Sequence, residues 1–255
     1  MLRKNEDTPF RPVVAITMGD ANGIGPEILA KALSGHAWHT TSIPVVFGCK
    51  NVLEQTGRQL PGMPMLYAID DLNEIDRDSS AIPVFQSGCS TLPVNPGILD
   101  KEVSRWAAVW IESAVNLACS GRIHGVVTCP VNKEGLLQAG CPYAGHTPML
   151  QAFTGVEHCH MSLFHERLRI VHITAHLSMR DAVAAVKKDV VLRAIEAGDT
   201  ALRRLGFVQP RLCVSGLNPH AGENGAFGRE QIEEISPAVQ TARKRGINCA
   251  GPYAP

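Results

Sequence analysis

The chain has 255 residues, of which 45% are hydrophobic and 19% are charged. That is enough to bury the core of one large domain or of two modest ones. Lysine plus arginine and aspartate plus glutamate each total 24, so the formal net charge is zero, which argues against a nucleic-acid-binding protein.

In chain order, short apolar runs alternate with helical patterns. The predicted elements are a strand at 13–18, a helix at 26–33, strands at 44–48 and 65–69, a helix at 100–120, a strand at 123–129, a helix at 133–139, strands at 161–164 and 168–174 that could pair, a mostly helical stretch at 181–205, a buried strand at 212–217 and a helix at 229–245. This alternation predicts an α/β fold with a largely parallel sheet and flanking helices.

The helix at 100–120 has the clearest pattern. Asp100 can cap its start and Gly121 can end it, while Val103, Ala107 and Trp110 begin an apolar face at helical spacing. We expect its tryptophans to lie in the core rather than to contact a cofactor. By contrast, residues 57–96 are rich in proline, glycine and serine, which favours a second subdomain or an irregular excursion within the single domain formed by residues 1–255.

No targeting or membrane-spanning segment is evident in the sequence. The first 11 residues are charged, and no apolar stretch approaches the length needed to cross a membrane. The eight cysteines form no CxxC pair, and a chain of this length needs no disulfide framework. We therefore expect a cytoplasmic protein with reduced cysteines and no nucleic-acid or membrane partner.

Three polar segments follow predicted strands or precede predicted helices in the first part of the chain. GDANGIGPE at 19–27 is a glycine-rich junction that could hold an anion or simply turn the chain. Lys133, in TCPVNK, could meet a phosphate or carboxylate or be an ordinary solvated lysine. His146 and Thr147 stand at a helix start, where they could bind a polar substrate, although a lone histidine is more often structural.

His176 and His220 each follow a predicted strand, so we expect both to project toward one edge of the sheet. Two neutral imidazoles suit Zn²⁺ or a similar divalent ion, and a catalytic site needs a third ligand. Glu223 lies just beyond His220 and could support it or contact substrate. A purely structural role for both histidines carries equal weight. The triplet at 158–160 (His-Cys-His) is expected to be a surface turn, because adjacent strand residues point to opposite faces.

Five motifs taken together resemble, in order and spacing, those of the 4-hydroxythreonine-4-phosphate dehydrogenase family. They are MGDANGIGPE, TCPVNKEGL, AGHTPML, HITAHLSMRDA and GLNPHAGENGAFG. The resemblance runs from about residue 11 to residue 255. It implies a fold like that of isocitrate and isopropylmalate dehydrogenases, with two subdomains and a cleft between them. It also implies a homodimer whose active sites draw on both subunits.

The resemblance assigns roles by position. His176 and His220 match two of the family's three metal-binding histidines, and His146 and Thr147 match its substrate-binding pair. The implied reaction is oxidation of a secondary alcohol by NAD, followed by decarboxylation, with a divalent ion (Zn²⁺, Mg²⁺, Mn²⁺ or Co²⁺) as Lewis acid. No catalytic or NAD-binding residue is assigned, and Lys133 is a further substrate-binding candidate.

Two departures from the family pattern stand out. Ala21-Asn22 replaces the usual Pro-Ala, which alters a turn more than a catalytic group. The family's third metal histidine belongs to a segment beyond the position of Pro255, so we expect either a fragment or a naturally short protein, with weakened metal binding in either case.

The expected substrate is 4-hydroxy-L-threonine 4-phosphate, in pyridoxal phosphate biosynthesis. A 4-phosphorylated threonate or erythronate of sugar-acid catabolism, or an aromatic cis-dihydrodiol, fits the same chemistry, because small pocket differences separate these substrates. A non-catalytic remnant or dimerisation module is the alternative of another class. A metal-dependent hydrolase with Glu223 as base is a more distant one.

Overall fold

The computed structural model describes residues 10–35, 37–58, 60–143 and 145–255. The chain divides into two compact units, unit 1 (Met1–Glu157) and unit 2 (His158–Pro255). Each unit has its own hydrophobic core, so the units are described in turn.

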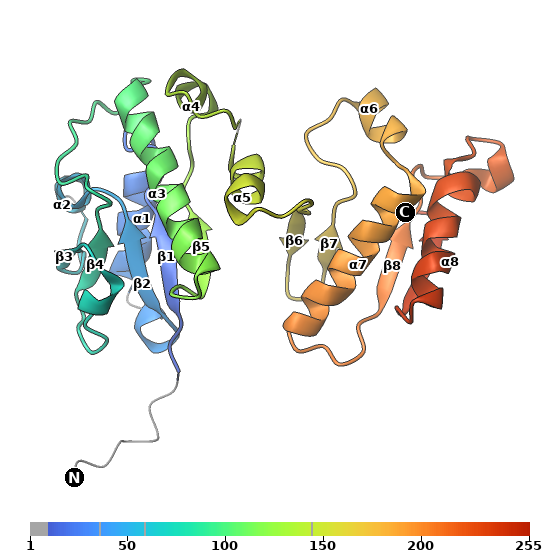
Figure 1. The fold of residues 1–255 in the computed structure, drawn as a ribbon, viewed down its shortest axis with the longest axis horizontal. Coiled ribbons are helices and arrows are strands. Elements are labelled where there is room, and N and C mark those ends of the chain that lie inside the picture. The colour runs from blue at the N-terminus through green and yellow to red at the C-terminus, as the bar shows by residue number, and fades with distance from the viewer. Residues whose placement is uncertain (1–9, 36, 59, 144) are drawn as a thin grey trace, which may run out of the picture. The chain divides into compact units, whose positions relative to one another are not determined.

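Unit 1 is built on a parallel sheet of five strands in the order β3-β4-β2-β1-β5 (Figure 1). Its strands are short apolar runs, as expected for strands that are covered on both faces. Their bounds are β1 Val13–Thr17, β2 Ile43–Phe47, β3 Leu66–Ile69, β4 Ile82–Phe85 and β5 Gly125–Thr128.

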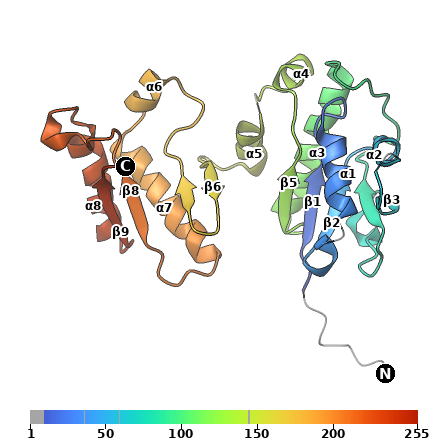
Figure 2. The same cartoon turned by 180° about the vertical axis from the view of Figure 1, so that it is seen from behind.

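Helices cover both faces of this sheet, with α3 on one face and α1 and α2 on the other (Figures 1 and 2). Asp100 caps α3, because its side chain accepts hydrogen bonds from the N–H groups of Glu102 and Val103. Trp110 is fully buried and Trp106 packs beside it, which confirms the core assignment of the tryptophans. The helices of unit 1 are α1 Gly25–Ser34, η1 Ala37–Thr40, α2 Lys50–Gly57, η2 Leu72–Glu74, α3 Lys101–Cys119, α4 Lys133–Gln138 and α5 His146–Thr154.

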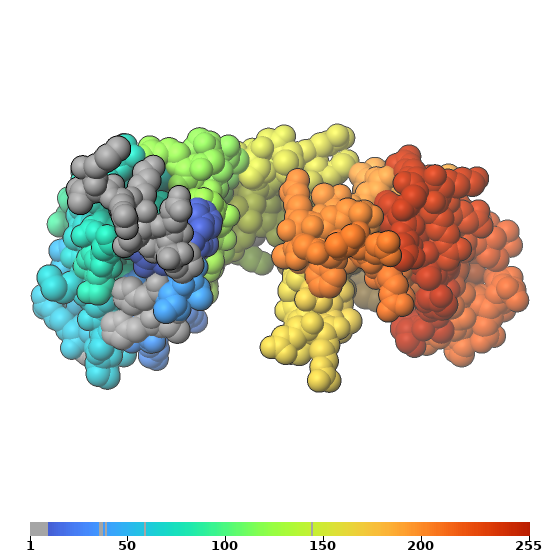
Figure 3. Space-filling view, turned by 90° about the horizontal axis from the view of Figure 1, so that it is seen from below, coloured from blue at the N-terminus to red at the C-terminus, as the bar shows by residue number. Residues whose placement is uncertain are grey.

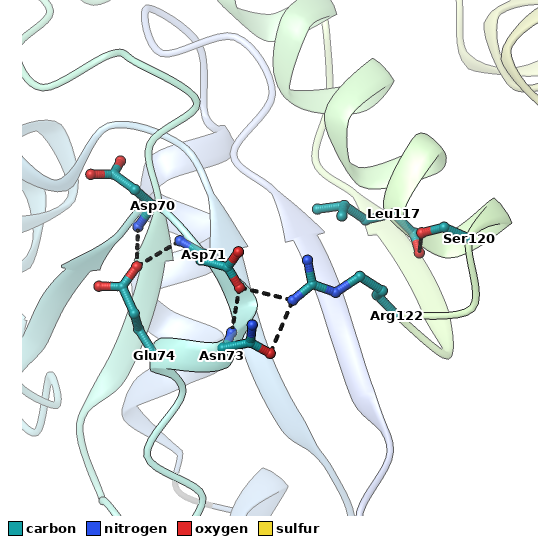
Figure 4. A network of polar contacts seen from close by, with 7 residues as sticks. All are labelled: Asp70, Asp71, Asn73, Glu74, Leu117, Ser120 and Arg122. Atoms are coloured by element: carbon teal, nitrogen blue, oxygen red, sulfur yellow. Dashed lines mark hydrogen bonds and ion pairs between the residues drawn. The ribbon is translucent and has the colours of Figure 1, made fainter.

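Residues 57–96 do not form a subdomain of their own. They contribute β3 and β4 to the main sheet, and their polar turns lie before β3, between β3 and β4, and after β4. Figure 4 shows one of these connections: Asp71 and Glu74 form a capping box at η2, and Arg122 donates hydrogen bonds to the side chains of Asp71 and Asn73. This contact joins the end of β3 to the loop before β5. The hydrogen bond from the Arg122 guanidinium lowers the pKa of Asp71.

Unit 2 packs α7 and α8 against short strands. Its core is formed around Val191 and Ile195 of α7, Val239 of α8, and Ile235 at the end of η4, which directly precedes α8. The elements are β6 Ser162–Phe164, β7 Arg169–Val171, α6 Met179–Ala184, α7 Lys188–Arg204, β8 Leu212–Ser215, η3 Glu223–Gly225, η4 Gln231–Ile235, α8 Ser236–Lys244 and β9 Cys249–Tyr253.

Several details of unit 2 differ from the sequence-based prediction. The predicted helix at 181–205 is two helices, because the chain turns at residues 185–187 before α7 begins. Strand β8 was predicted to be buried, but only Val214 within it is buried. Strand β9, which pairs in parallel with β8, was not predicted, because its sequence CAGPY contains glycine and proline.

Among the described residues, none of the helices combines the length and apolar character needed to cross a membrane. All eight cysteines are thiols rather than disulfides. The triplet at 158–160 lies outside helices and strands, and His158 and Cys159 are exposed, which agrees with the predicted surface position, but no turn is formed at these residues.

Candidate active site

In unit 1, the loops that follow β1 and β5 meet at the carboxyl ends of these neighbouring strands. The Asp20 N–H donates to the carbonyl oxygen of Pro130 at 2.9 Å. Gly19 makes this approach feasible: its φ is +72°, and a Cβ placed on it would lie 2.3 Å from the same oxygen. The glycine-rich junction is therefore packed directly against the second polar segment, which the sequence pattern alone could not show.

Asn22 fixes the other side of the same loop. It is buried, its side-chain amide donates to the carbonyl of Ile98 at 2.8 Å, and its side-chain oxygen accepts from the N–H of Asn95 at 2.7 Å. The Asn22 side chain thus ties the 19–25 loop to the segment that holds Asn95 and Ile98.

The third polar segment joins this region through α5. Lys133 is exposed at the start of α4, and its Cε lies 3.6 Å from the position of a Cβ built on Gly145. His146 and Thr147 are half-buried at the first turn of α5, and the His146 ring hydrogen-bonds the backbone of Cys129. The structure therefore brings Lys133 and His146, two predicted substrate-binding residues, to the end of β5.

His146 has one ring nitrogen in use and one unused. The hydrogen bond to the Cys129 backbone favours the protonated ring and so raises its pKa, which means that the ring donates to the carbonyl oxygen. The other ring nitrogen, Nε2, is buried and has no hydrogen-bond partner. Burial is the larger influence and lowers the pKa of His146. A neutral ring that donates from Nδ1 presents Nε2 as an acceptor, which suits a hydroxyl group of a ligand. The neighbouring thiol of Cys129 is buried with a raised pKa, so it is not an activated nucleophile.

The lowered pKa of His146 predicts a pH dependence of stability. The unfolded chain takes up a proton near the ordinary histidine pKa of 6.5, while the folded chain resists until a lower pH. The contribution of neutral His146 to the free energy of unfolding is therefore complete above pH 6.5. It declines as the pH falls through 6.5 toward the lower pKa that His146 has in the folded chain. Urea unfolding at a series of pH values should show a steeper loss on acidification for the wild-type chain than for His146→Leu. Equal pH slopes for the two chains would contradict the prediction.

In unit 2, His220 follows β8 in a tightly bonded loop. Its Nδ1 lies 2.8 Å from the Glu223 carboxylate oxygen, and its ring packs on Phe227 with 4.9 Å between the ring centroids. Asn218 organises the loop, because its side-chain oxygen accepts from the N–H groups of His220 and Gly222, both at 3.1 Å. This arrangement engages Nδ1 and leaves Nε2 as a single potential ligand atom of the ring.

His176 lies after β7, is exposed, and adopts a left-handed backbone with φ of +59°. The expectation that His176 and His220 leave one sheet edge is wrong: β7 pairs with β6, and β8 pairs with β9. Both strands instead pack against α7. In the part of the chain that the structure describes, no group of three or more histidine, cysteine, aspartate or glutamate side chains is arranged to hold a metal ion.

Two features of these sites escaped sequence reasoning. The role of Asn22 depends on residues more than 70 positions away, and the Cys129 carbonyl is a backbone group that every sequence contains.

A parallel sheet with helices on both faces, and polar loops gathered at its carboxyl edge, is a common architecture of enzymes that bind small molecules. Comparison with known proteins makes this specific. Residues 40–255 match the model of the family described as "Pyridoxal phosphate biosynthetic protein PdxA". The chain belongs to this family and is an oxidoreductase of the dehydrogenase class.

Among its relatives, the chain is 36% identical to D-threonate 4-phosphate dehydrogenase of Pectobacterium atrosepticum, over 95% of this chain and 75% of the relative. It is 40% identical to the Cupriavidus necator enzyme of the same name, over 95% of this chain and 73% of the relative. It is 37% identical to 4-hydroxythreonine-4-phosphate dehydrogenase of Desulfosudis oleivorans, over 96% of this chain and 73% of the relative.

Solved structures give the same result. The crystal structure of a 4-hydroxythreonine-4-phosphate dehydrogenase from Burkholderia phymatum matches with a TM-score of 0.85 and 38% identity, over 96% of this chain and 74% of that one. A terephthalate 1,2-cis-dihydrodiol dehydrogenase from Burkholderia xenovorans matches less well, with a TM-score of 0.64 and 28% identity, over 96% of this chain and 74% of that one. The expected family and α/β fold are confirmed.

Proposed function

We propose that this chain oxidises, with decarboxylation, a four-carbon hydroxy acid phosphorylated at C4, using NAD and a divalent metal ion. The observation that carries the proposal is the buried, unpartnered Nε2 of His146 at the start of α5, where the Lys133 side chain approaches the preceding Gly145. A ligand hydroxyl would satisfy this nitrogen, and the Lys133 ammonium would attract an anionic group. The family match gives the reaction class.

D-Threonate 4-phosphate is the first candidate substrate, because relatives at 36% and 40% identity are named for it. 4-Hydroxythreonine 4-phosphate is the second, because a relative at 37% identity is named for that substrate. The two compounds share a carboxylate, a C3 hydroxyl and a 4-phosphate, and differ in whether C2 carries a hydroxyl or an amino group. The likeness to the dihydrodiol dehydrogenase is weaker, so we do not propose a cis-dihydrodiol as the substrate.

When bound, NAD supplies the hydride acceptor and the divalent ion polarises the hydroxyl oxygen. The chain's own residues bind and orient. We assign ligand contacts to His146, Thr147 and Lys133 in unit 1, and metal coordination to His176 and His220 in unit 2. Neutral His146 would accept a hydrogen bond from a substrate hydroxyl through Nε2 and so align the carbon from which hydride leaves. Zn²⁺ suits imidazole ligands, whereas Mn²⁺ favours oxygen ligands.

We also infer a homodimer in the cytoplasm. The hairpin of β6 and β7 exposes the apolar side chains of Leu163, Phe164, Leu168 and Ile170, and Figure 3 shows this yellow segment at the surface of unit 2. A groove beside it is lined by apolar and polar side chains, which are Phe164, Glu196, Ala197, Thr200, Ala201, Arg204 and Leu205. We infer that a second copy of the chain covers these exposed apolar side chains. Eight thiols without disulfides suit a reducing compartment.

The test is NADH formation by this chain with Mn²⁺, Co²⁺ or Zn²⁺, using D-threonate 4-phosphate, D-erythronate 4-phosphate and 4-hydroxy-L-threonine 4-phosphate in parallel. We expect one 4-phosphorylated acid to be turned over above the others, and its unphosphorylated parent to be a poor substrate. Calorimetry with each compound checks binding separately from turnover. A folded chain that neither binds nor oxidises any of the three would contradict the proposal.

A further inference from the structure

Cys49 and Cys89 are two buried cysteines of unit 1 whose thiol groups hydrogen-bond each other. Cys49 follows β2 and Cys89 follows β4, and these strands pair in parallel, so both cysteines lie at the carboxyl edge of the sheet. The two loops are joined again where the Lys50 N–H donates to the Gln86 side chain at 3.4 Å. The Cys49 thiol also donates to the side-chain oxygen of Asn51 at 2.8 Å. Two sulfurs that are distant in the sequence are thus neighbours in the fold.

A strained turn holds Cys89 in this position. Ser87 and Gly88 have positive φ values of 53° and 90°, and the Cys89 N–H donates to the Gln86 carbonyl at 2.9 Å, which closes the turn. A serine rarely adopts this conformation unless the surrounding structure enforces it. Cys89 is 2% exposed, whereas Gly88 and Ser90 on either side of it are exposed. A local opening of this turn, without global unfolding, would therefore admit a small oxidant to the pair.

The two thiols differ in reactivity. The hydrogen bond from the Cys89 thiol lowers the pKa of Cys49 to about 7, against the effect of burial. The N–H groups of Asn51 and Val52, at the start of α2, act in the same direction. The same thiol contact and burial raise the pKa of Cys89, and burial alone raises that of Cys249 in unit 2. Because the thiolate is the nucleophilic form, Cys49 is the attacking sulfur of the pair and Cys89 the resolving one.

The chain that leaves Cys89 leads to the loop of the candidate active site. Residues 90–94 join Cys89 to Asn95, whose N–H donates to the Asn22 side chain at 2.7 Å, and the Gly97 N–H donates to the Asn22 carbonyl at 2.8 Å. Asn22 belongs to the 19–25 loop. A disulfide holds its sulfurs about 2.05 Å apart, closer than two hydrogen-bonded thiols, so its formation must shift one of the two cysteine loops. A shift at Cys89 would reach Asn22 through this short segment.

We propose that Cys49 and Cys89 form a reversible disulfide when hydrogen peroxide oxidises them, and that this bond is a redox switch acting on the 19–25 loop. The Cys49 thiolate attacks the peroxide, so that an S–O bond forms, the O–O bond breaks and the leaving hydroxide takes up a proton to become water. The Cys89 sulfur then attacks the Cys49 sulfur, the S–S bond forms, and the departing hydroxide leaves with the Cys89 proton as a second water. Two thiols are oxidised and one peroxide is reduced. This inference goes beyond the proposed function and does not depend on its substrate.

Peptide mapping of the whole chain tests the disulfide. The chain is treated with hydrogen peroxide, alkylated and digested without reduction, and linked peptides are identified by mass spectrometry. We expect a link between Cys49 and Cys89 that dithiothreitol removes. Cys89→Ser should lose the link and accumulate a sulfenic acid on Cys49, which dimedone traps, whereas Cys49→Ser should leave Cys89 a thiol. Cys249→Ser is the matched control, because it removes a buried thiol of raised pKa in unit 2 and should retain the link.

Amide hydrogen exchange tests the effect of the disulfide on the 19–25 loop. The Asn95 and Gly97 amides, which donate to Asn22, should exchange faster in the oxidised chain than in the reduced one. Peroxide treatment of Cys89→Ser should leave the exchange of these amides unchanged, because that variant cannot form the bond.

Each result has a clear meaning. Oxidation that links other cysteines while Cys49 and Cys89 remain thiols overturns the inference. A sulfenic acid on Cys89 in Cys49→Ser, without one on Cys49 in Cys89→Ser, overturns the assignment of the attacking sulfur. A Cys49–Cys89 link that leaves the Asn95 and Gly97 amides unchanged overturns the switch. NADH formation by the reduced chain tests the proposed function separately, so the two can fail independently.

Discussion

Gly19→Ala should lower the free energy of unfolding of unit 1 by roughly 2–5 kcal/mol. Two costs combine at this position. An alanine must adopt the left-handed backbone at φ of +72°, and its Cβ would lie 2.3 Å from the Pro130 carbonyl oxygen. That oxygen accepts from Asp20 N–H, so the loop can move only by giving up this hydrogen bond. Urea unfolding gives the free energy directly.

Two glycines of unit 1 separate these costs. Gly121 has a φ of +74° but open space around its Cβ position, so Gly121→Ala should show the backbone cost alone, about 1–2 kcal/mol. Gly23 has no left-handed backbone, and its added Cβ would meet its nearest neighbour at 3.4 Å, so Gly23→Ala should be nearly neutral. If Gly19→Ala cost no more than Gly121→Ala, the close approach of the two loops would not exist in solution.

His146→Leu should raise the Kd for the 4-phosphorylated substrate roughly 10- to 150-fold, the equivalent of losing one hydrogen bond to a charged or strongly polar ligand. The fold should tolerate the change at pH 8. The variant loses the bond to the Cys129 carbonyl, but it also removes a buried nitrogen that has no partner. Calorimetry measures the Kd, and urea unfolding measures the stability.

His124→Leu is the control for His146→Leu. His124 lies in the same unit, and its Nδ1 accepts a hydrogen bond from the Val13 N–H at 3.1 Å. That ring nitrogen therefore already has a partner within the protein. This variant should lose stability and retain the Kd, the reverse of the expectation for His146→Leu. A His146→Leu chain that binds substrate as well as wild type would remove the main support for the proposed site in unit 1.

The sequence by itself was sufficient for much of the fold. The apolar runs of β1, β2 and β5 and the capped, amphipathic α3 were predicted within a few residues, because each depends on neighbours close in the chain. The five motifs were sufficient for the family, because their order and spacing are properties of the sequence. Strand β9 was missed, since its proline and glycine argue locally against a strand that pairing with β8 stabilises.

The candidate site depended on tertiary structure. Lys133 and His146 could be named from their motifs, but the contact of Cys129 and Pro130 with the 19–25 loop follows from the parallel pairing of β1 with β5. Asn22 and the Cys129 carbonyl acquire their roles only through partners distant in sequence. The separate pairing of β7 and β8 likewise depends on strand contacts. Local propensity and motif spacing thus determined the elements and the family, while long-range hydrogen bonding and burial decided which polar atoms were left without a partner in the protein.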